Sequence, residues 1–378
     1  MLPRKRGAGL AAFTLLTLAP PLAAQTNDPL FAGFRWAPSA VGSRPAGMGG
    51  AFVGLADSVK AAAANPAGLT LIPVNEIGLS LGKPWIAAGI GWEHLRVAGY
   101  LTQTDEARVE LPELDPSSRG FLDSSVWEAG LAMGAELHPR VRLGASLAWS
   151  RLRLEGQRTV ANADDGEETV ASSVDSEEGS LRGSVGLLVV LVGANARSLP
   201  SLRLGVSYQP GFDWSARMRS DPAAPAAAIA IRRPTLITAG FAWRAVDRWS
   251  FVAEGDVIRY GEIVDALERN VGPSAAAGFR LANVVEPRLG AEFSAPLWCG
   301  CGSVKLRGGL HYRAPATLIY EGADPVAARA FAPGRWKTVA TFGASWFSEY
   351  FGNGIRLDLD AGDLIEGPEL SFGIVWRF

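Results

Sequence analysis

Apolar and polar residues alternate in short segments from about residue 77 to the end of the chain. In segment 202–209, one face holds Leu202, Leu204, Val206 and Tyr208, and the other holds polar residues and glycine. The same period of two recurs in segments 249–257, 304–313, 355–361 and 370–378. Because successive side chains of a strand point to opposite faces, each segment has an apolar and a polar face. The pattern predicts an all-β region.

We expect about 14 strands, an even number that suits an up-and-down antiparallel barrel. Their spans are near 77–82, 85–92, 95–103, 122–137, 141–159, 180–194, 202–217, 231–244, 249–260, 284–295, 303–314, 335–347, 354–362 and 369–378. Short links such as 138–140 and 246–248 alternate with long links at 103–121, 159–179, 218–230, 261–274 and 314–335. In membrane barrels the short turns face the periplasm and the long loops face outside. The unequal links therefore predict that the short links face the periplasm and the long links face outside.

A soluble β-sandwich would show this alternation with its apolar face inward, and a transmembrane barrel would show it with its apolar face outward. Aromatic residues near the segment ends favour the barrel: Trp149, Tyr208, Trp243, Trp249, Tyr312, Trp346, Trp376 and Phe378. Such residues form girdles at the membrane interfaces. Leu152 and Leu154 lie out of phase with the apolar residues of 141–149. Either a β-bulge lies near 150–151 or, as we favour, the strand has left the membrane there.

The N-terminus has the parts of a secretory signal peptide. Arg4, Lys5 and Arg6 form a basic region, an apolar run follows at 8–18, and small residues precede Gln25. We expect a signal peptide at 1–24, since the alternative, a membrane anchor, would need a longer run. After Gln25 the most apolar run, 185–192, is far below the ~20 residues of a membrane helix. The formal net charge of −2 gives no indication of nucleic-acid binding.

The stretch 44–69 is unlike the segments that follow it. It reads Gly47-Met48-Gly49-Gly50-Ala51-Phe52, continues with Phe52, Leu55 and Val59 at helical spacing, and closes on Asn65-Pro66-Ala67-Gly68-Leu69. We expect a helix that ends at Asn65, because the residue before a proline disfavours the helical conformation. The glycines allow close backbone approach or positive φ. So little side-chain volume suits a confined space, such as the bore of a barrel.

These residues resemble the N-terminal hatch of the FadL family of outer-membrane transporters, which carry long-chain fatty acids and other hydrophobic compounds. The resemblance implies a transmembrane antiparallel β-barrel of about 14 strands at 77–378, preceded at 25–76 by an N-terminal arm and a small α-helical hatch that plugs the lumen. It also implies passive uptake without a cofactor, by a monomer surrounded by outer-membrane lipid and lipopolysaccharide. The terminal Phe378 is similar to the signal by which the barrel-assembly machinery recognises such barrels. The implied hatch and gate residues are Gly47, Met48, Gly49, Gly50, Phe52, Asn65, Pro66, Ala67 and Gly68.

A second use of the same fold stays open. PorV-type barrels, which act as shuttles in secretion, have a similar hatch motif. The motif therefore does not decide between a channel and a secretion-associated protein.

The inward face of the expected barrel carries charges of both signs. On the assigned phase it holds Arg142, Arg203, Glu254, Asp256, Arg288, Glu292, Lys305, Arg307, His311, Arg313, Arg356, Asp358 and Asp360. In one interpretation these charges pair with one another and brace the wall. In the other, the basic row of Lys305, Arg307, His311 and Arg313 binds a carboxylate headgroup, for which arginine is well suited.

Three further features bear on chemistry. The acidic segment 163–179 is expected to be a solvated loop, with a calcium site or a contact to cation-bridged lipopolysaccharide as alternatives. Cys299 and Cys301 lie in an expected periplasmic turn, where they are either bridged or idle thiols, with too few neighbouring ligands for a metal. With three histidines and no Gly-x-Ser-x-Gly elbow, the chain is expected not to be an enzyme.

Overall fold

The computed structural model describes residues 42–378, with gaps at 83, 111–117, 162–167, 194, 196–198, 220–225, 247, 300–301, 316–317, 326–327, 329–330, 351–352 and 366–368. The expected signal peptide at 1–24 and the beginning of the expected N-terminal arm lie outside the described residues. Cys299 is disulfide-bonded, and Cys301 lies outside the described residues.

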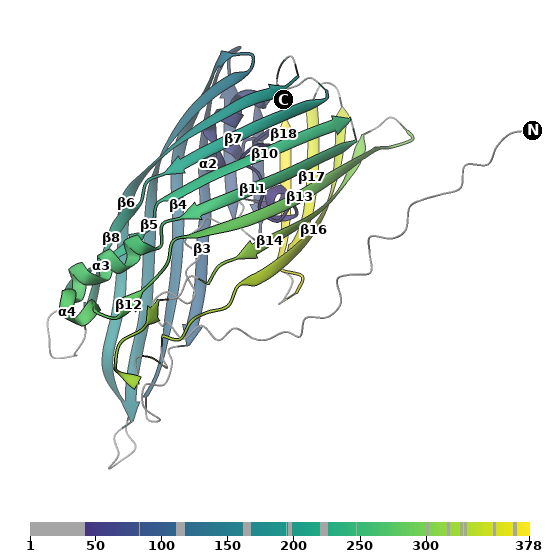
Figure 1. Ribbon diagram of the computed structural model, residues 1–378. Helices are drawn as coiled ribbons and strands as arrows, with labels where there is room; N and C mark the ends of the chain where they lie inside the picture. Colours follow the sequence, from purple (N-terminus) through teal and green to yellow (C-terminus); the bar gives the residue numbers. More distant parts are fainter. Residues whose placement is uncertain are drawn as a thin grey trace, which may run out of the picture.

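Fourteen strands form a closed antiparallel barrel (Figure 1). In ring order they are β1 (Glu76–Leu81), β2 (Trp85–Gly91), β3 (Leu95–Glu110), β4 (Ser118–His138), β5 (Val141–Ala161), β6 (Glu168–Val192), β7 (Ser201–Gln209), β10 (Leu236–Val246), β11 (Trp249–Ile258), β13 (Val284–Pro296), β14 (Ser303–Arg313), β16 (Lys337–Tyr350), β17 (Asn353–Gly362) and β18 (Glu369–Arg377). The ring closes where β1 pairs with β18, with Ile77 opposite Trp376. The predicted 14-stranded antiparallel barrel is confirmed.

The two ends of the barrel differ in their connections. The C-terminus lies at the end that carries the short links, which we call the short-turn end (Figure 1). We call the opposite end the long-loop end. The strands that extend toward it differ in length: β4 and β5 have 21 residues each and β6 has 25, whereas β7 has 9. The same end carries α3 (Gly261–Val271), α4 (Pro273–Ala276), and the short pair of β12 (Phe279–Arg280) with β15 (Ile319–Tyr320). Within the described ranges, no helix is both long and apolar enough to cross a membrane.

The outer surface of the barrel is apolar because each strand turns its apolar residues outward. The eight aromatic residues predicted to form girdles are all exposed, with relative exposures between 41% and 52%. Trp249 stacks on Phe251 and contacts Phe293 near the short-turn end, where Trp376 also contacts Phe378. Polar side chains fill the alternate positions and point into the bore, where all but a few are buried. A soluble sandwich would show the reverse arrangement.

The phase slip in β5 has a physical explanation. β5 pairs with β4 without a register shift at 150–151, so the β-bulge alternative is wrong. Leu152 and Leu154 point inward and are buried, while Arg151 and Arg153 point outward and are exposed. Beyond Trp149 the apolar residues of β5 therefore face inward and the charged residues face outward. This arrangement agrees with the interpretation that the strand has left the membrane there.

Several sequence-based element boundaries are wrong at the long-loop end. The expected strands 202–217 and 231–244 are each interrupted, at Pro210 and at Pro234, because proline has no N–H for the ladder. The intervening residues form a hairpin of β8 (Phe212–Arg219) and β9 (Ala227–Arg233), while β7 and β10 pair directly. Segment 261–274, expected to be a loop, contains α3.

The expected loop 159–179 is also wrong in part, because most of its described residues extend β5 and β6. Glu168, Asp175, Glu177 and Glu178 lie in β6, and Glu177 forms an ion pair with Arg151 of β5. The other acidic residues of the segment, Asp164, Asp165 and Glu167, lie outside the described residues. In the part of the chain that the structure describes, no group of three or more His, Cys, Asp or Glu is arranged to hold a metal ion.

Residues 42–72, which we call the inner segment, precede the barrel and contain little regular structure. The segment has α1 (Ser43–Ala46), α2 (Ala61–Ala64) and the 3-10 helix η1 (Pro66–Leu71). The expected helix through Phe52, Leu55 and Val59 is wrong, since the chain makes turns there and Ala56 has a φ of 34°. The expected end at Asn65 is confirmed: α2 stops at Ala64, and Asn65 has extended backbone before Pro66.

Candidate functional site

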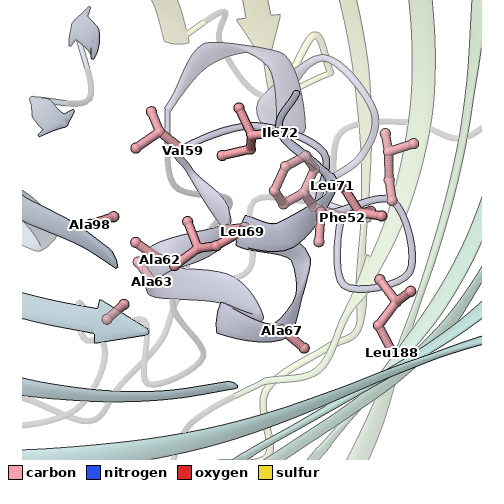
Figure 2. Close-up of a cluster of buried hydrophobic side chains, with 14 of the residues drawn as sticks. Phe52, Val59, Ala62, Ala63, Ala67, Leu69, Leu71, Ile72, Ala98 and Leu188 are labelled. Carbon is pink, nitrogen blue, oxygen red and sulfur yellow. The ribbon is translucent and has the colours of Figure 1, made fainter. Parts of the chain in front are cut away.

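The inner segment lies inside the barrel and fills its bore near the short-turn end. Nearly all its residues are buried, and Figure 2 shows Phe52, Leu69, Leu71 and Ile72 gathered against wall residues such as Leu188. Together they form one apolar cluster with inward side chains of β2, β3, β4, β5, β6, β10 and β11. The wall residues of this cluster are mostly small, because the segment takes up the space that larger side chains would fill.

Ion pairs attach the first half of the inner segment to one side of the wall. Arg44 donates to both carboxylate oxygens of Glu292 on β13, at 2.9 Å each, and to Asp57 of the segment itself at 2.5 Å. Burial would raise the pKa of Asp57, but the charges of Arg44, Arg203 and Arg244 outweigh this effect and hold the pKa well below its usual range. Asp57 is therefore a carboxylate and part of the attachment.

Wall carboxylates also accept hydrogen bonds from backbone amides of the inner segment. Glu254 on β11 accepts from the N–H groups of Phe52 and Val53, both at 2.7 Å. Glu76 on β1 accepts from the N–H of Val59 at 2.8 Å. These bonds satisfy amides that have no helical partner in this part of the segment, so the wall replaces the missing helix.

Glycines allow the segment and the wall to approach each other without side chains between them. A Cβ on Gly309 of β14 would overlap the backbone of Met48 and Gly49, and one on Gly290 of β13 would lie 2.6 Å from the Met48 oxygen. Gly49 has a φ of 66° and its N–H donates to Thr341 Oγ1 at 2.8 Å. The predicted close approach thus occurs on both sides of this contact.

The second half of the inner segment, which runs from α2 onward, is held by Asn65, which is fully buried. Its Nδ2 donates to the carbonyl oxygens of Val53 at 2.9 Å and of Leu187 on β6 at 3.2 Å, and its Oδ1 accepts from the N–H of Ala67 at 3.3 Å. Pro66, Ala67 and Gly68 follow in η1. Apart from the Leu187 bond, this half meets β4, β5 and β6 through small residues and apolar contact.

One buried lysine of the segment has an unusual environment. Lys60 donates to Ser43 Oγ at 3.2 Å and its Nζ lies 5.4 Å from the centroid of the Trp85 ring. Burial lowers the pKa of Lys60 to about 7, although Asp358 and Asp360 attract its charged form. The inner segment therefore contains a group that titrates near neutral pH.

The basic row predicted to bind a carboxylate lies inside the barrel, where most of its members bond to wall groups. Arg307 donates to Glu292 at 2.8 Å, to Asp358 at 2.9 Å, to Asp360 at 3.1 Å and to Ser345 Oγ at 2.5 Å. Lys305 also donates to Glu292, at 3.2 Å, and His311 Nε2 lies 2.8 Å from Glu286. Arg313, at the long-loop end of the same strand, takes part in an interaction of its own. These contacts correspond to the interpretation in which the charges brace the wall.

A second apolar cluster fills the long-loop end of the bore. It joins Leu122, Val126, Leu152 and Leu154 of β4 and β5 to Trp214 of β8, Ile231 of β9, Ile258 of β11 and Ile263 of α3, among others. A polar layer lies on the side toward the inner segment, where Glu128 of β4 forms ion pairs with Arg182 of β6 and Arg233 of β9. Sequence reasoning missed this layer, although Glu128 and Arg182 are at inward positions of their strands.

The outer wall carries an apolar groove opposite the Met48–Gly49 contact. The groove has a volume of about 620 Å³ and lies between Phe241, Trp243 and Phe251 on one side and Leu289 and Leu310 on the other. Its floor includes Gly290 and Gly309, whose inner side touches the inner segment. At these two glycines only the strand backbone separates the groove from the inner segment.

The fold has counterparts among solved structures. A FadL homologue from Pseudomonas aeruginosa superposes with a TM-score of 0.65 at 10% sequence identity, over 89% of this chain and 96% of that one. The toluene transporter TbuX of Ralstonia pickettii gives 0.59 at 13% over 91% and 100%, and the toluene transporter TodX of Pseudomonas putida gives 0.56 at 13% over 89% and 97%. No family model matches the chain, and no curated protein sequence matches it significantly. The chain thus has the barrel fold of these hydrophobic-compound transporters.

Proposed function

We propose that this protein is a passive outer-membrane channel for hydrophobic small molecules, including long-chain fatty acids, and that the inner segment is the hatch that gates it. The observation that carries the proposal is how the bore is filled. The hatch fills the bore near the short-turn end, and the second apolar cluster fills the long-loop end. The outward apolar surface supports insertion in a membrane. The printed names of the structural neighbours, which include two toluene transporters, support a hydrophobic substrate.

In this proposal a molecule enters at the long-loop end, where the apolar side chains of the second cluster offer it a nonpolar environment. It then leaves through the wall or passes the Glu128 layer and the hatch, whose gate residues in this proposal are Gly47, Met48, Gly49, Gly50, Phe52, Asn65, Pro66, Ala67 and Gly68. A hydrophobic molecule gains by avoiding water along this path. No cofactor takes part.

A side exit has support from the strand pairing. β6 pairs with β7 from Val185 onward and with β8 at Ser173 and Val174. Among the described residues, no ladder pairing joins 175–184 of β6 to a neighbour on this side. Trp214 of β8 is buried beside this gap and donates to the Ser150 oxygen of β5 at 3.2 Å. A displaced Trp214 would open the gap to the membrane.

The test is a reversible lock on the hatch. A Cβ on Gly134 of β4 would lie 3.2 Å from Leu69 Cβ, close to the ~3.5–4.5 Å between the Cβ atoms of a disulfide. The same Cβ would lie 2.5 Å from the Pro66 oxygen, so the Gly134→Cys single variant is the control for any displacement of the hatch by the new side chain. In cells that produce the Leu69→Cys/Gly134→Cys variant, we expect uptake of labelled hexadecanoic acid and of toluene to stop on oxidation and to resume on reduction. The wild type and the two single variants, with and without reductant, are the controls.

Two outcomes would contradict the proposal separately. Equal uptake by the oxidised and the reduced double variant would exclude gating by the hatch. Uptake by the wild type no faster than by cells that lack the chain would exclude the channel.

A further inference from the structure

Arg203 is a buried arginine that forms no ion pair within 4 Å among the described residues. It lies on the inward face of β7 with 1% relative exposure, and its Nε and Nη2 atoms have no hydrogen-bond partner among the described residues. Other buried arginines of the bore, such as Arg307 and Arg288, bond directly to carboxylates. A buried charge without a counter-charge destabilises a fold. Such a group persists where it has another use.

Two further polar groups face the same space. Ser201, two residues before Arg203 on the same face of β7, is fully buried, and in the part of the chain that the structure describes its Oγ has no hydrogen-bond partner. Ser201 stands directly opposite Arg244 of β10, which is half-buried. Arg203 and Arg244 both act on the charge of Asp57. The three groups therefore form one cluster at the short-turn side of the hatch.

The cluster has an excess of positive charge. Asp57 is the carboxylate whose charge acts most strongly on Arg203, but Arg44 already binds it at 2.5 Å, and Arg44 is itself shared with Glu292. Glu292 in turn binds Lys305 and Arg307. Arg142 on β5, two strands from β7, pairs with Glu136 at 2.6 Å. The local carboxylates are thus committed to other cations, and an added anion would complete the charge balance.

Apolar side chains surround the cluster on the side of the hatch. Val190 of β6 and Ala242 of β10 lie opposite Arg203 on its two neighbouring strands. Both belong to the apolar cluster that contains Phe52 and Leu55 of the inner segment. A ligand here would meet a charged end and an apolar surface together.

We propose that Arg203, Arg244 and Ser201 bind the carboxylate of an amphiphilic ligand whose chain lies against this apolar cluster. The assignment rests on the proposed channel function and locates the headgroup of such a ligand within the bore. Arginine can donate two parallel hydrogen bonds to a carboxylate, and a hydroxyl can add a third. The site lies at the short-turn side of the hatch, so it would hold the headgroup of a molecule that has passed the gate. The predicted basic row of Lys305, Arg307, His311 and Arg313 is the rival location for the same carboxylate.

Equilibrium binding of two matched probes tests the assignment. Labelled hexadecanoic acid and hexadecan-1-ol have the same chain length and differ in charge. They are measured on the purified full-length protein in nonionic detergent, at a pH at which the acid is ionised. The variants are Arg203→Gln, Arg203→Lys, Lys305→Gln for the rival row, and Arg153→Gln as a surface control.

We expect Arg203→Gln to weaken binding of the acid by about tenfold or more and to change binding of the alcohol by less than about twofold, since a charge-assisted bond is lost only for the acid. Arg203→Lys should keep part of the preference, and Arg153→Gln should be silent. An equal effect of Arg203→Gln on both probes, or a loss of the preference in Lys305→Gln alone, would overturn the assignment. If neither probe binds the wild type, the channel proposal itself fails.

A second measurement needs no variant. Bromide soaked into crystals of the wild-type protein should give an anomalous peak beside the Arg203 guanidinium. A peak there supports an anion site even if Arg203→Gln does not fold. Crystals that bind bromide elsewhere but not at Arg203 would contradict it.

Discussion

Replacing Asn65 by alanine should release the second half of the inner segment. The Asn65 side chain makes three hydrogen bonds in a fully buried position, two within the segment and one to the Leu187 carbonyl of β6. Alanine would remove the bonds to the carbonyl oxygens of Val53 and Leu187 and to the amide of Ala67. No described side chain of η1, which follows Asn65, hydrogen-bonds to the wall.

The size of the effect follows from these bonds. Each buried hydrogen bond contributes about 0.5–1.5 kcal/mol, so three give about 2–4 kcal/mol. At about 1.4 kcal/mol per factor of ten, local opening of the segment should increase between about 30-fold and several hundredfold. Thr70→Val is the matched control, because Thr70 makes a single side-chain bond to the Ala67 oxygen at 3.0 Å. Its expected effect is about tenfold at most.

Amide hydrogen exchange measures this opening directly. The amides of Gly68 and Ile72 bond within the segment, to the oxygens of Asn65 and Leu69, and should lose protection in Asn65→Ala by the factors above. Barrel amides in β13 and β14 should keep theirs. Exchange at 62–72 that is unchanged from the wild type, or no faster than in Thr70→Val, would refute the reasoning that Asn65 holds this half in place.

Three further variants test other contacts. Gly309→Ala should lower the free energy of unfolding by about 1–3 kcal/mol, because its Cβ would overlap Met48 and Gly49. Gly308→Ala should not lower it, since its Cβ would lie 4.0 Å from its nearest neighbour. Chemical denaturation compares the two variants. Glu128→Gln leaves Arg182 and Arg233 without their counter-charge and should destabilise the docked β8–β9 hairpin by about 3–5 kcal/mol, seen as faster exchange at 227–233. Lys60 has a pKa of about 7 when buried and about 10.5 when exposed, so between these values the opened segment binds one more proton. Raising the pH from 7 should therefore favour the closed segment by about tenfold per unit, with no further change below pH 7 and no such dependence in Lys60→Met.

The barrel could be predicted from the sequence because its signal is local. A strand such as β11 shows its two faces within ten residues, and its expected span of 249–260 is close to the observed Trp249–Ile258. The β8–β9 hairpin was missed although Pro210 and Pro234 mark both of its ends. α3 was missed because its amphipathic pattern, with Ile263 and Leu267 four residues apart, lies within a stretch that was interpreted as a loop.

The site could be predicted only as a set of inward charges. Which charges pair depends on register and on the closure of the ring, which alternation does not determine. Arg44 meets Glu292 across 248 residues of sequence, and Arg233 meets Glu128 across 105. The same limit hid Arg203, since its lack of a partner is a property of the assembled bore.

The two halves of the inner segment are attached differently, and this difference predicts which half moves. The first half is held by the Arg44 ion pairs and by the carboxylates of Glu254 and Glu76, whereas the second has one side-chain bond to the wall through Asn65. A Cβ on Gly373 of β18 would lie 3.3 Å from Ser43 Cβ, so Ser43→Cys/Gly373→Cys can lock the first half as Leu69→Cys/Gly134→Cys locks the second. If the second half opens while the first stays attached, oxidation should stop uptake only in the Leu69–Gly134 pair. Blocked uptake in the Ser43–Gly373 pair would show instead that the ion-paired half must leave the wall, and the strength of the Arg44 contacts would then set the opening rate.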